Sequence, residues 1–190
     1  MKLTSITPTP QMLKALTHPG RLRMLGLLRS DGPATATTLA ARLGLNTGAT
    51  SYHLRQLAQS GFVEEDTERG NGRDRWWRAA HQSTYTKAPD PADRDAEETL
   101  DAYLQAVATV QTEQLQRAIE ERPLLPSEWR AASTFSDWEI RLTPARLAAL
   151  LEALVATIEE TEEVEAGGDA AEVVVQLLAF PRPGRVGGEE

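Results

Sequence analysis

Hydrophobic positions recur at helical spacing through the first sixty residues, in segments separated by strong turn signals. Residues 11–17 and 19–30 predict two helices, because Met12, Leu13 and Leu16 are apolar in the first and leucines recur in the second. His18-Pro19-Gly20 separates these two helices, and Asp31-Gly32-Pro33 ends the second. Two more helices are predicted over 35–43 and from Asn46 or Thr47 to residue 59, with Gly44 at the sharp turn between them, where glycine takes a positive φ at little cost.

Farther along the chain, the pattern of apolar residues and turn signals predicts β-strands. Residues 62–69 and 73–80 flank Gly70-Asn71-Gly72, which predicts a β-hairpin. Residues 134–142 alternate apolar and polar side chains, and residues 173–180 are apolar on both faces, so each predicts a strand. Between them, Thr143-Pro144 is typical of a helix start. Upstream, a linker over 88–95 precedes a long helix predicted for 96–121.

Together these elements predict a mostly α fold with small β content. We expect a winged helix-turn-helix DNA-binding domain over 1–87, and a linker with a long dimerisation helix over 88–122. An appended strand-helix-strand unit would cover 123–181, with a disordered tail over 182–190. The aromatic residues of the appended unit would form its core, and are listed as Trp129, Phe135, Trp138 and Phe180.

Charge divides the chain into two halves. Residues 1–85 carry 11 Lys and Arg against 6 Asp and Glu, whereas 86–190 carry 9 against 22, so balances of +5 and -13 make up the net charge of -8. A basic first half is typical of a surface that meets phosphate, although two ordinary solvated surfaces would give the same asymmetry. The sequence contains no apolar run of the length that forms a membrane span, and its first ten residues have no apolar signal-peptide core. We therefore expect a cytoplasmic protein.

The sequence holds no recognisable catalytic or cofactor-binding motif. There is no phosphate-binding glycine loop and no nucleophile elbow, so we expect neither an enzyme nor a cofactor. With no cysteine, thiolate metal sites are excluded. The histidines are His18, His53 and His81, and their scatter favours structural roles over metal ligation.

The helix predicted to end near residue 59 has two distinct sides. On a helical wheel, Thr50, Leu54 and Leu57 share the side that would pack on the preceding helix. The candidate DNA-binding residues of this helix are Thr47, Gly48, Ser51, Tyr52, Arg55 and Gln56. Gln56 lies between the two sides, and Arg55 is the first candidate for base readout because arginine bonds guanine bidentately. An amphipathic surface helix without a DNA role is the plainer alternative.

The predicted hairpin is rich in arginine. Arg69, Arg73 and Arg75 are candidate DNA contacts, with Arg78 farther along, since such side chains clamp phosphates or enter a minor groove. A solvated hairpin is the alternative. Adjacent Trp76 and Trp77 must point to opposite faces of their strand, so one of them is expected in the core.

Three motifs in order resemble winged helix-turn-helix regulators of the arsenic-repressor-like (ArsR) family: the run from Leu16 to Leu25, the run Ser51-Tyr52-His53-Leu54-Arg55-Gln56-Leu57 with Gly61-Phe62-Val63, and Gly72-Arg73 with Trp76-Trp77-Arg78. The resemblance covers about residues 8–85. It implies a homodimer on a palindromic operator and repression relieved by a signal. The cysteines of the metal-sensing members are absent, so their metal chemistry is not implied here.

The long helix is the candidate dimer interface. Its apolar stripe consists of Leu100, Tyr103, Leu104, Val107 and Val110. Packing of this stripe within its own chain is the alternative. We therefore expect a sequence-specific regulator, a dimeric repressor that binds double-stranded DNA, with a small apolar effector in the appended unit as an additional partner. A winged-helix protein-interaction module and a nonspecific DNA organiser are the alternatives.

Overall fold

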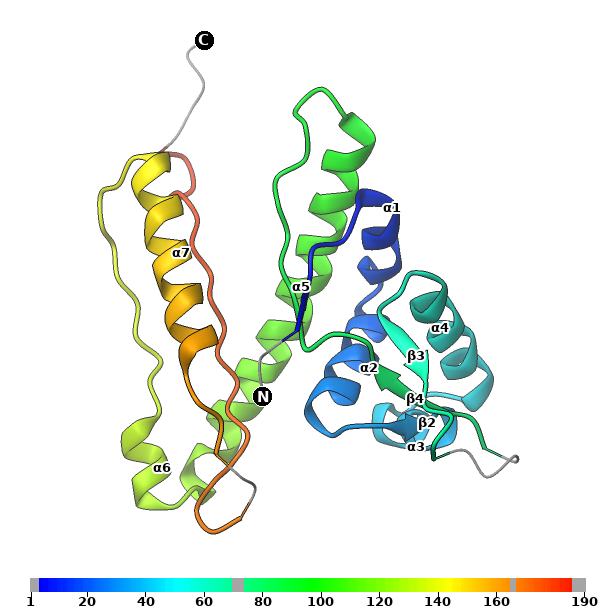
Figure 1. The fold of residues 1–190 in the computed structure, drawn as a ribbon. Helices are drawn as coiled ribbons and strands as arrows, with labels where there is room; N and C mark the ends of the chain where they lie inside the picture. Colours follow the sequence, from blue (N-terminus) through cyan, green and yellow to red (C-terminus); the bar gives the residue numbers. More distant parts are fainter. Residues whose placement is uncertain (1–3, 70–73, 165–166, 186–190) are drawn as a thin grey trace.

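The computed structural model describes residues 4–69, 74–164 and 167–185, and Figure 1 shows their arrangement. The N-terminal domain lies on one side of a long helix, α5 (Arg94–Glu121), and a second helical unit lies on the other. Helices dominate, and the strands are two to four residues long. The predicted class, mostly α with small β content, is confirmed.

The N-terminal helices begin and end where the sequence signals place them. They are α1 (Pro10–Leu13) with the 3-10 turn η1 (Lys14–Leu16), α2 (Pro19–Ser30), α3 (Ala36–Leu43) and α4 (Thr47–Gln59). The Asn46 side chain caps α4 by accepting a hydrogen bond from the Ala49 N–H at 2.8 Å. Gly44 ends α3 in the left-handed region at φ 65°, as predicted for the turn between α3 and α4.

The wing is a three-stranded antiparallel sheet. β4 (Trp76–Ala79) lies between β2 (Ala34–Thr35) and β3 (Val63–Glu65), with Val63 opposite Ala79 and Ala34 opposite Trp77. The predicted hairpin is confirmed, with shorter strands than expected, and its turn at 70–72 lies outside the described residues. The sequence did not reveal β2, nor the parallel pair of β1 (Ser5–Ile6) and β5 (Ser83–Thr84).

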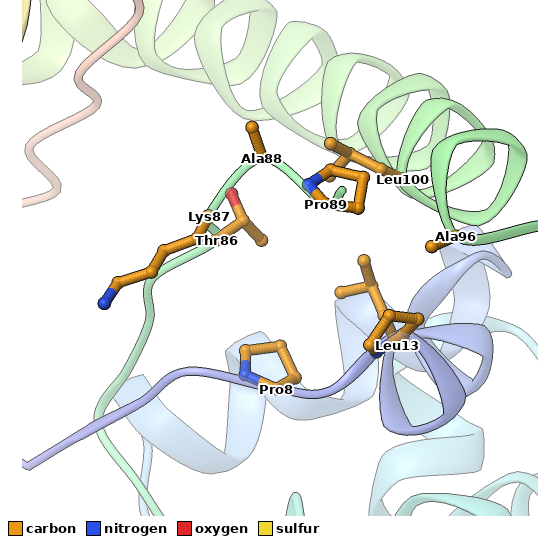
Figure 2. A pocket seen from close by; sticks show the side chains of 9 residues that line it. Pro8, Leu13, Thr86, Lys87, Ala88, Pro89, Ala96 and Leu100 are labelled. Atoms are coloured by element: carbon orange, nitrogen blue, oxygen red, sulfur yellow. The ribbon is translucent and has the colours of Figure 1, made fainter. Parts of the chain in front are cut away.

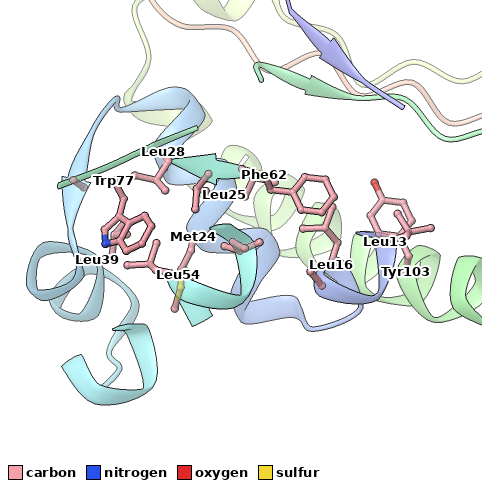
Figure 3. Close-up of a cluster of buried hydrophobic side chains, with 14 residues drawn as sticks. Leu13, Leu16, Met24, Leu25, Leu28, Leu39, Leu54, Phe62, Trp77 and Tyr103 are labelled. Carbon is pink, nitrogen blue, oxygen red and sulfur yellow. The ribbon is translucent and has the colours of Figure 1, made fainter. Parts of the chain in front are cut away.

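One hydrophobic core joins the four N-terminal helices, the wing and the first half of α5 (Figure 3). Leu54 and Leu57 of α4 are fully buried, as the helical wheel predicts. Trp77 is 6% exposed and Trp76 is half-buried. Trp77 is therefore the tryptophan in the core, as expected when adjacent strand residues point to opposite faces. The other members of the core come from α1, η1, α2, β2, α3, β3 and α5, together with Phe62. α4 is thus held to the core by its apolar side.

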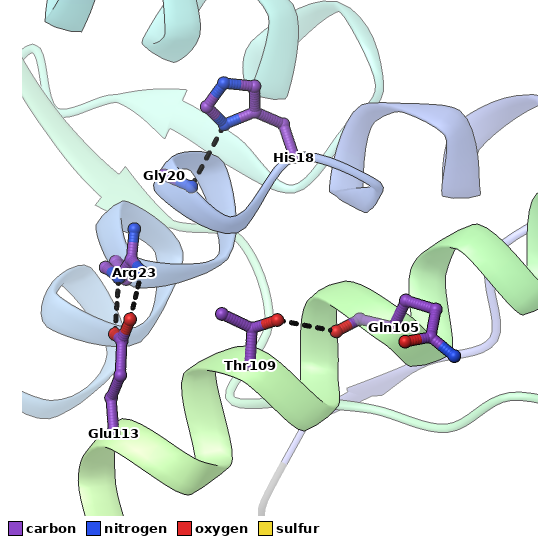
Figure 4. A network of polar contacts seen from close by, with 6 residues as sticks. All are labelled: His18, Gly20, Arg23, Gln105, Thr109 and Glu113. Carbon is purple, nitrogen blue, oxygen red and sulfur yellow. Dashed lines mark hydrogen bonds and ion pairs between the residues drawn. The ribbon is translucent and has the colours of Figure 1, made fainter.

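α5 is anchored to the N-terminal domain along its first five turns. It packs on α1, η1 and α2, and its Tyr103 is only 8% exposed because the ring joins the core. Arg23 of α2 donates two hydrogen bonds to the Glu113 carboxylate, at 2.8 and 2.5 Å, which ties α2 to the second half of α5 (Figure 4). This bidentate pair and the apolar contacts make α5 a continuation of the N-terminal domain.

The appended unit differs from the prediction. It contains the 3-10 turn η2 (Arg122–Leu124), α6 (Ser127–Ala132) and α7 (Pro144–Glu160), so the central helix is confirmed and α6 is an addition. Residues 134–142 and 173–180 are extended, but neither forms a strand. The alternation at 134–142 and the apolar run at 173–180 are present, but a strand also needs a neighbouring chain segment to bond, and neither segment has one among the described residues.

The aromatic residues of the appended unit do not form a core, which corrects a second prediction. Phe135, Trp138 and Phe180 are 52%, 78% and 70% exposed, and Trp129 is half-buried. No described residue between 123 and 185 is buried. The predicted tail at 182–190 lies largely outside the described residues. Among the residues that the structure describes, no helix has the length and apolarity required to cross a membrane.

Candidate nucleic-acid interface

α4 presents one side to solvent and buries the other. Thr50, Leu54 and Leu57 are fully buried against the core. On the opposite side, Tyr52 is 55% exposed, and Thr47, Gly48 and Arg55 are also exposed. The polar side of the helix is therefore available to a ligand as large as a DNA duplex.

Arg55 is the most available cation on this side. In the described part of the chain it makes no ion pair, in contrast to most arginines of the domain. It lines a polar groove of about 280 Å³ between α4, the start of α3 and the base of the wing. Thr47 and Ser51 line the same groove, as do Asp74 and Arg75 on the wing side. The groove brings residues predicted from two separate elements onto one surface.

Two of the candidate DNA-binding residues of α4 are less exposed to solvent than expected. Ser51 is half-buried within the groove. Gln56 is also half-buried, and its Nε2 donates a hydrogen bond to Gln59 Oε1 at 3.2 Å. Gln56 therefore lies at the margin of the exposed side, which matches its intermediate position on the helical wheel.

Three arginines of the wing, Arg69, Arg75 and Arg78, have carboxylate partners, which sequence reasoning missed. The Arg75–Glu65 and Arg78–Glu64 pairs have N–O distances of 3.2 and 2.8 Å, and Arg75 also lies over the Trp77 ring. Arg69 Nε lies 3.6 Å from the buried carboxylate of Asp66. Arg73 lies outside the described residues. The signal was present in the acidic run at 64–66, because the hairpin register sets Glu64 opposite Arg78.

Sequence reasoning also missed a cluster of rings at α4, formed by His18, Tyr52 and His53 next to Arg21. The His18 and His53 ring centroids lie 4.6 Å apart, and Tyr52 packs beside His53. Burial lowers the pKa of His53, and the neighbouring His18 and Arg21 lower it further. His18 Nδ1 accepts the Gly20 N–H at 3.0 Å, which caps α2 (Figure 4). His53 and His18 thus support the fold, and Arg21 adds a positive charge next to Tyr52.

The predicted dimer stripe on α5 faces largely into its own chain. Tyr103 is a core residue, and Leu100 and Val107 pack against the core. Val110 is half-buried, and Leu104 remains 46% exposed. Farther along α5, Leu115 and Ile119 are 44% and 49% exposed. Dimerisation through α5 remains a prediction, and of the predicted set Leu104 is the large apolar side chain that remains exposed.

A second, smaller pocket of about 170 Å³ lies at the start of α5 (Figure 2). Pro8 and Leu13 line one side, Ala96 and Leu100 line another, and the linker from Thr86 to Pro89 closes it. Lys87 points away from the space (Figure 2), so the lining is mainly apolar. This pocket belongs to the junction of α1 and α5, and the appended unit takes no part in it.

Comparison with known proteins agrees with the class defined by this geometry. Residues 16–66 match the family model described as a helix-turn-helix domain, and this interval contains α2, α3, α4 and β3. The chain therefore carries a helix-turn-helix domain with an adjoining β wing. It is similar to the HTH-type transcriptional regulator YgaV of Escherichia coli (strain K12), with 33% identity over 57 residues. The match covers 30% of this chain and spans 58% of the length of that relative.

Proposed function

We propose that this protein is a transcriptional regulator that binds double-stranded DNA as a homodimer and represses transcription. The observation that carries the proposal is the exposed side of α4 beside the wing, where Arg55, which has no ion pair among the described residues, lies near Thr47, Ser51 and Tyr52. An arginine on the second helix of a helix-turn-helix domain is well placed to bond a guanine in the major groove. The similarity of part of this chain to an HTH-type transcriptional regulator supports a role in transcriptional regulation.

The charge distribution supports DNA as the partner. The basic first half contains the helix-turn-helix domain, and the acidic second half would be repelled by a duplex. The exposed ends of α3 and α4 carry threonine and asparagine, which can bond phosphates. A protein-interaction surface would instead expose apolar side chains on α4, where Tyr52 is the one large exposed aromatic among the described residues.

Dimerisation follows from the small reading surface of one domain. One α4 helix contacts few base pairs, and a second copy on an adjacent half-site doubles the contacts. The two α4 helices would then lie about 34–36 Å apart, one turn of DNA. Leu104 of α5 is exposed and belongs to the interface proposed for this arrangement. A small apolar effector in the appended unit stays a prediction.

The decisive experiment is selection of bound sequences from a random duplex pool by the purified full chain. A two-fold symmetric consensus would support both sequence-specific binding and a dimeric reader. Repression is tested separately, by placing that consensus over a reporter promoter and measuring transcription with and without the protein. Selection that yields no enriched sequence at low salt would refute the proposal, and an asymmetric consensus would refute the dimeric reader.

A further inference from the structure

The appended unit leaves a large apolar surface uncovered. Phe135 and Trp138 lie in one extended segment, and Phe180 lies in the other. Seven aliphatic side chains of the same two segments are 36% to 69% exposed, namely Ile140, Leu142, Val173, Val174, Val175, Leu177 and Leu178. Soluble chains seldom leave contiguous apolar surface of this size open to water, so a partner surface is expected here.

The backbone of the same segments is also unpartnered. Within the described residues, no backbone hydrogen bond joins 134–142 or 173–180 to any other part of the chain. Each segment is nevertheless extended for eight or nine residues, a length of about 26 to 30 Å at the rise of a strand. Extended backbone with free N–H and C=O groups is a template for strand pairing.

The direction of the two segments restricts what can pair with them. Both run alongside α7, one on each side of the helix in the view of Figure 1, and both run opposite to it. They are therefore parallel to each other, although they do not bond. The side chains of Arg182 and Glu139 lie 3.4 Å apart, which keeps the two segments near each other at one end.

We infer that the appended unit is completed by a second copy of this chain, through a four-stranded antiparallel sheet shared by the two copies. In this sheet the partner's 173–180 segment lies between 134–142 and 173–180 of the first copy. Two-fold symmetry makes the inserted segment antiparallel to both neighbours, as an antiparallel ladder requires. The order across the sheet is 134–142, the partner's 173–180, 173–180, and the partner's 134–142.

The side-chain pattern fits this order. Residues 173–180 are apolar on both faces, which suits the two central strands of a covered sheet. Residues 134–142 carry Asp137, Glu139 and Arg141 on one face, and charged side chains are typical of edge strands. A self-complementary pair of segments of matched length favours a second copy over an unrelated protein.

The area also fits a stable dimer. Buried aromatic side chains contribute about 150–250 Å² each, so the exposed fractions of Phe135, Trp138 and Phe180 amount to roughly 300–500 Å². The seven aliphatic side chains raise this to the order of 700 Å² per chain at full burial. An interface of standard size buries about 800 Å² per partner.

The shared sheet has in common with the proposed function only the presence of a second copy, and its formation does not require DNA.

The first test measures mass and amide exchange of the full chain without DNA. Light scattering is expected to give twice the 20.8 kDa mass of one chain. Amides of 173–180 should exchange at least tenfold more slowly in the dimer than after dilution to monomer. Val175→Asp should give a monomer with unprotected 173–180, because it places a charge in a central strand. Leu124→Asp is the matched control, since Leu124 is 84% exposed outside both segments.

Cross-linking keeps the test valid if Val175→Asp misfolds. The chain has no cysteine, so single-cysteine variants at Val174, Val175 and Gln176 give an unambiguous readout. At least one should form a disulfide-linked dimer on mild oxidation, because residues near the two-fold axis face their own copies, and Leu124→Cys should not.

Three results would overturn the inference. A monomer whose 173–180 amides are protected from exchange would mean that this segment pairs within its own chain. A dimer whose 173–180 amides are unprotected would mean that the copies use another interface, and a monomer with unprotected amides would leave the surface for a different protein. Because no DNA is present, each result is separate from the outcome of the sequence selection.

Discussion

Arg55→Ala is expected to weaken operator binding much more than binding to random DNA. A bidentate arginine–guanine contact discriminates by about 1–3 kcal/mol, which is roughly a 5- to 150-fold change in affinity per half-site. The upper part of this range applies because Arg55 is exposed and, within the described residues, has no ion pair to break before it meets a base. Its whole hydrogen-bonding capacity is available to the duplex.

Arg75→Ala provides the contrast within the same surface. The Arg75 guanidinium lies 3.2 Å from Glu65 and stacks over Trp77, so a phosphate must compete with an existing partner. Its loss should weaken consensus and random duplexes equally, and lower the slope of log K against log salt by no more than about 0.9 for each copy that binds. Arg146→Ala removes the same charge from exposed α7 and should change neither affinity nor slope.

The assay is fluorescence anisotropy with the selected consensus, a consensus with one base pair changed, and a random duplex, each at four salt concentrations. Arg55→Ala should lose affinity for the consensus and lose discrimination at one base-pair position. If all three duplexes weaken by the same factor, Arg55 binds a phosphate, and the base-reading argument is refuted. A thermal melt of each variant separates lost contacts from lost folding.

Three stability predictions follow from the described contacts, each checked by chemical denaturation. Asn46→Ala removes the cap of α4 and should cost about 1 kcal/mol, whereas Asn46→Asp keeps an acceptor and should cost much less. Gly44→Ala should cost about 1 kcal/mol because φ is +65°, while Gly26→Ala within α2, where an added Cβ meets nothing within 4 Å, should stabilise by about 0.5–1 kcal/mol; equal effects would contradict this reasoning. Glu113→Gln should cost up to about 1 kcal/mol at pH 7, since the pair is partly exposed. The hydrogen bond from Arg23 lowers the pKa of Glu113, so the folded state binds its proton less readily than the unfolded state. The contribution of Glu113 is therefore complete above the ordinary carboxylate range and is lost as pH falls through the lowered pKa, and the difference between wild type and Glu113→Gln should shrink in acid; a constant difference would refute this assignment.

Local signals were sufficient for the helices of the N-terminal domain. Pro19 at the start of α2, Asn46 as a cap and Gly44 as a stop all act within a few residues of their own position, so the sequence displays them directly. The exposed side of α4 was predictable for the same reason, because a helical wheel depends only on local spacing. Tyr52 and Arg55 accordingly lie where the wheel placed them.

Features that depend on distant partners were not predictable in the same way. The Arg75–Glu65 pair requires the hairpin register, and the Arg23–Glu113 pair joins residues ninety positions apart. A strand at 134–142 was predicted from local alternation and one at 173–180 from an apolar run, and Figure 1 shows both segments as extended chain. Whether an extended segment becomes a strand depends on a neighbour, which no local pattern contains.

The attachment of α5 to α2 also determines how the molecule can move. A helix of 28 residues is about 42 Å long, so a tilt of about 5° at one end displaces the other end by roughly 4 Å. Because the core holds the first half of α5 to the domain that carries α4, and Arg23 binds Glu113 in its second half, such a tilt would move the whole N-terminal domain. A small displacement of the end of α5 near α6 is therefore enough to change the spacing between the two α4 helices of the proposed dimer.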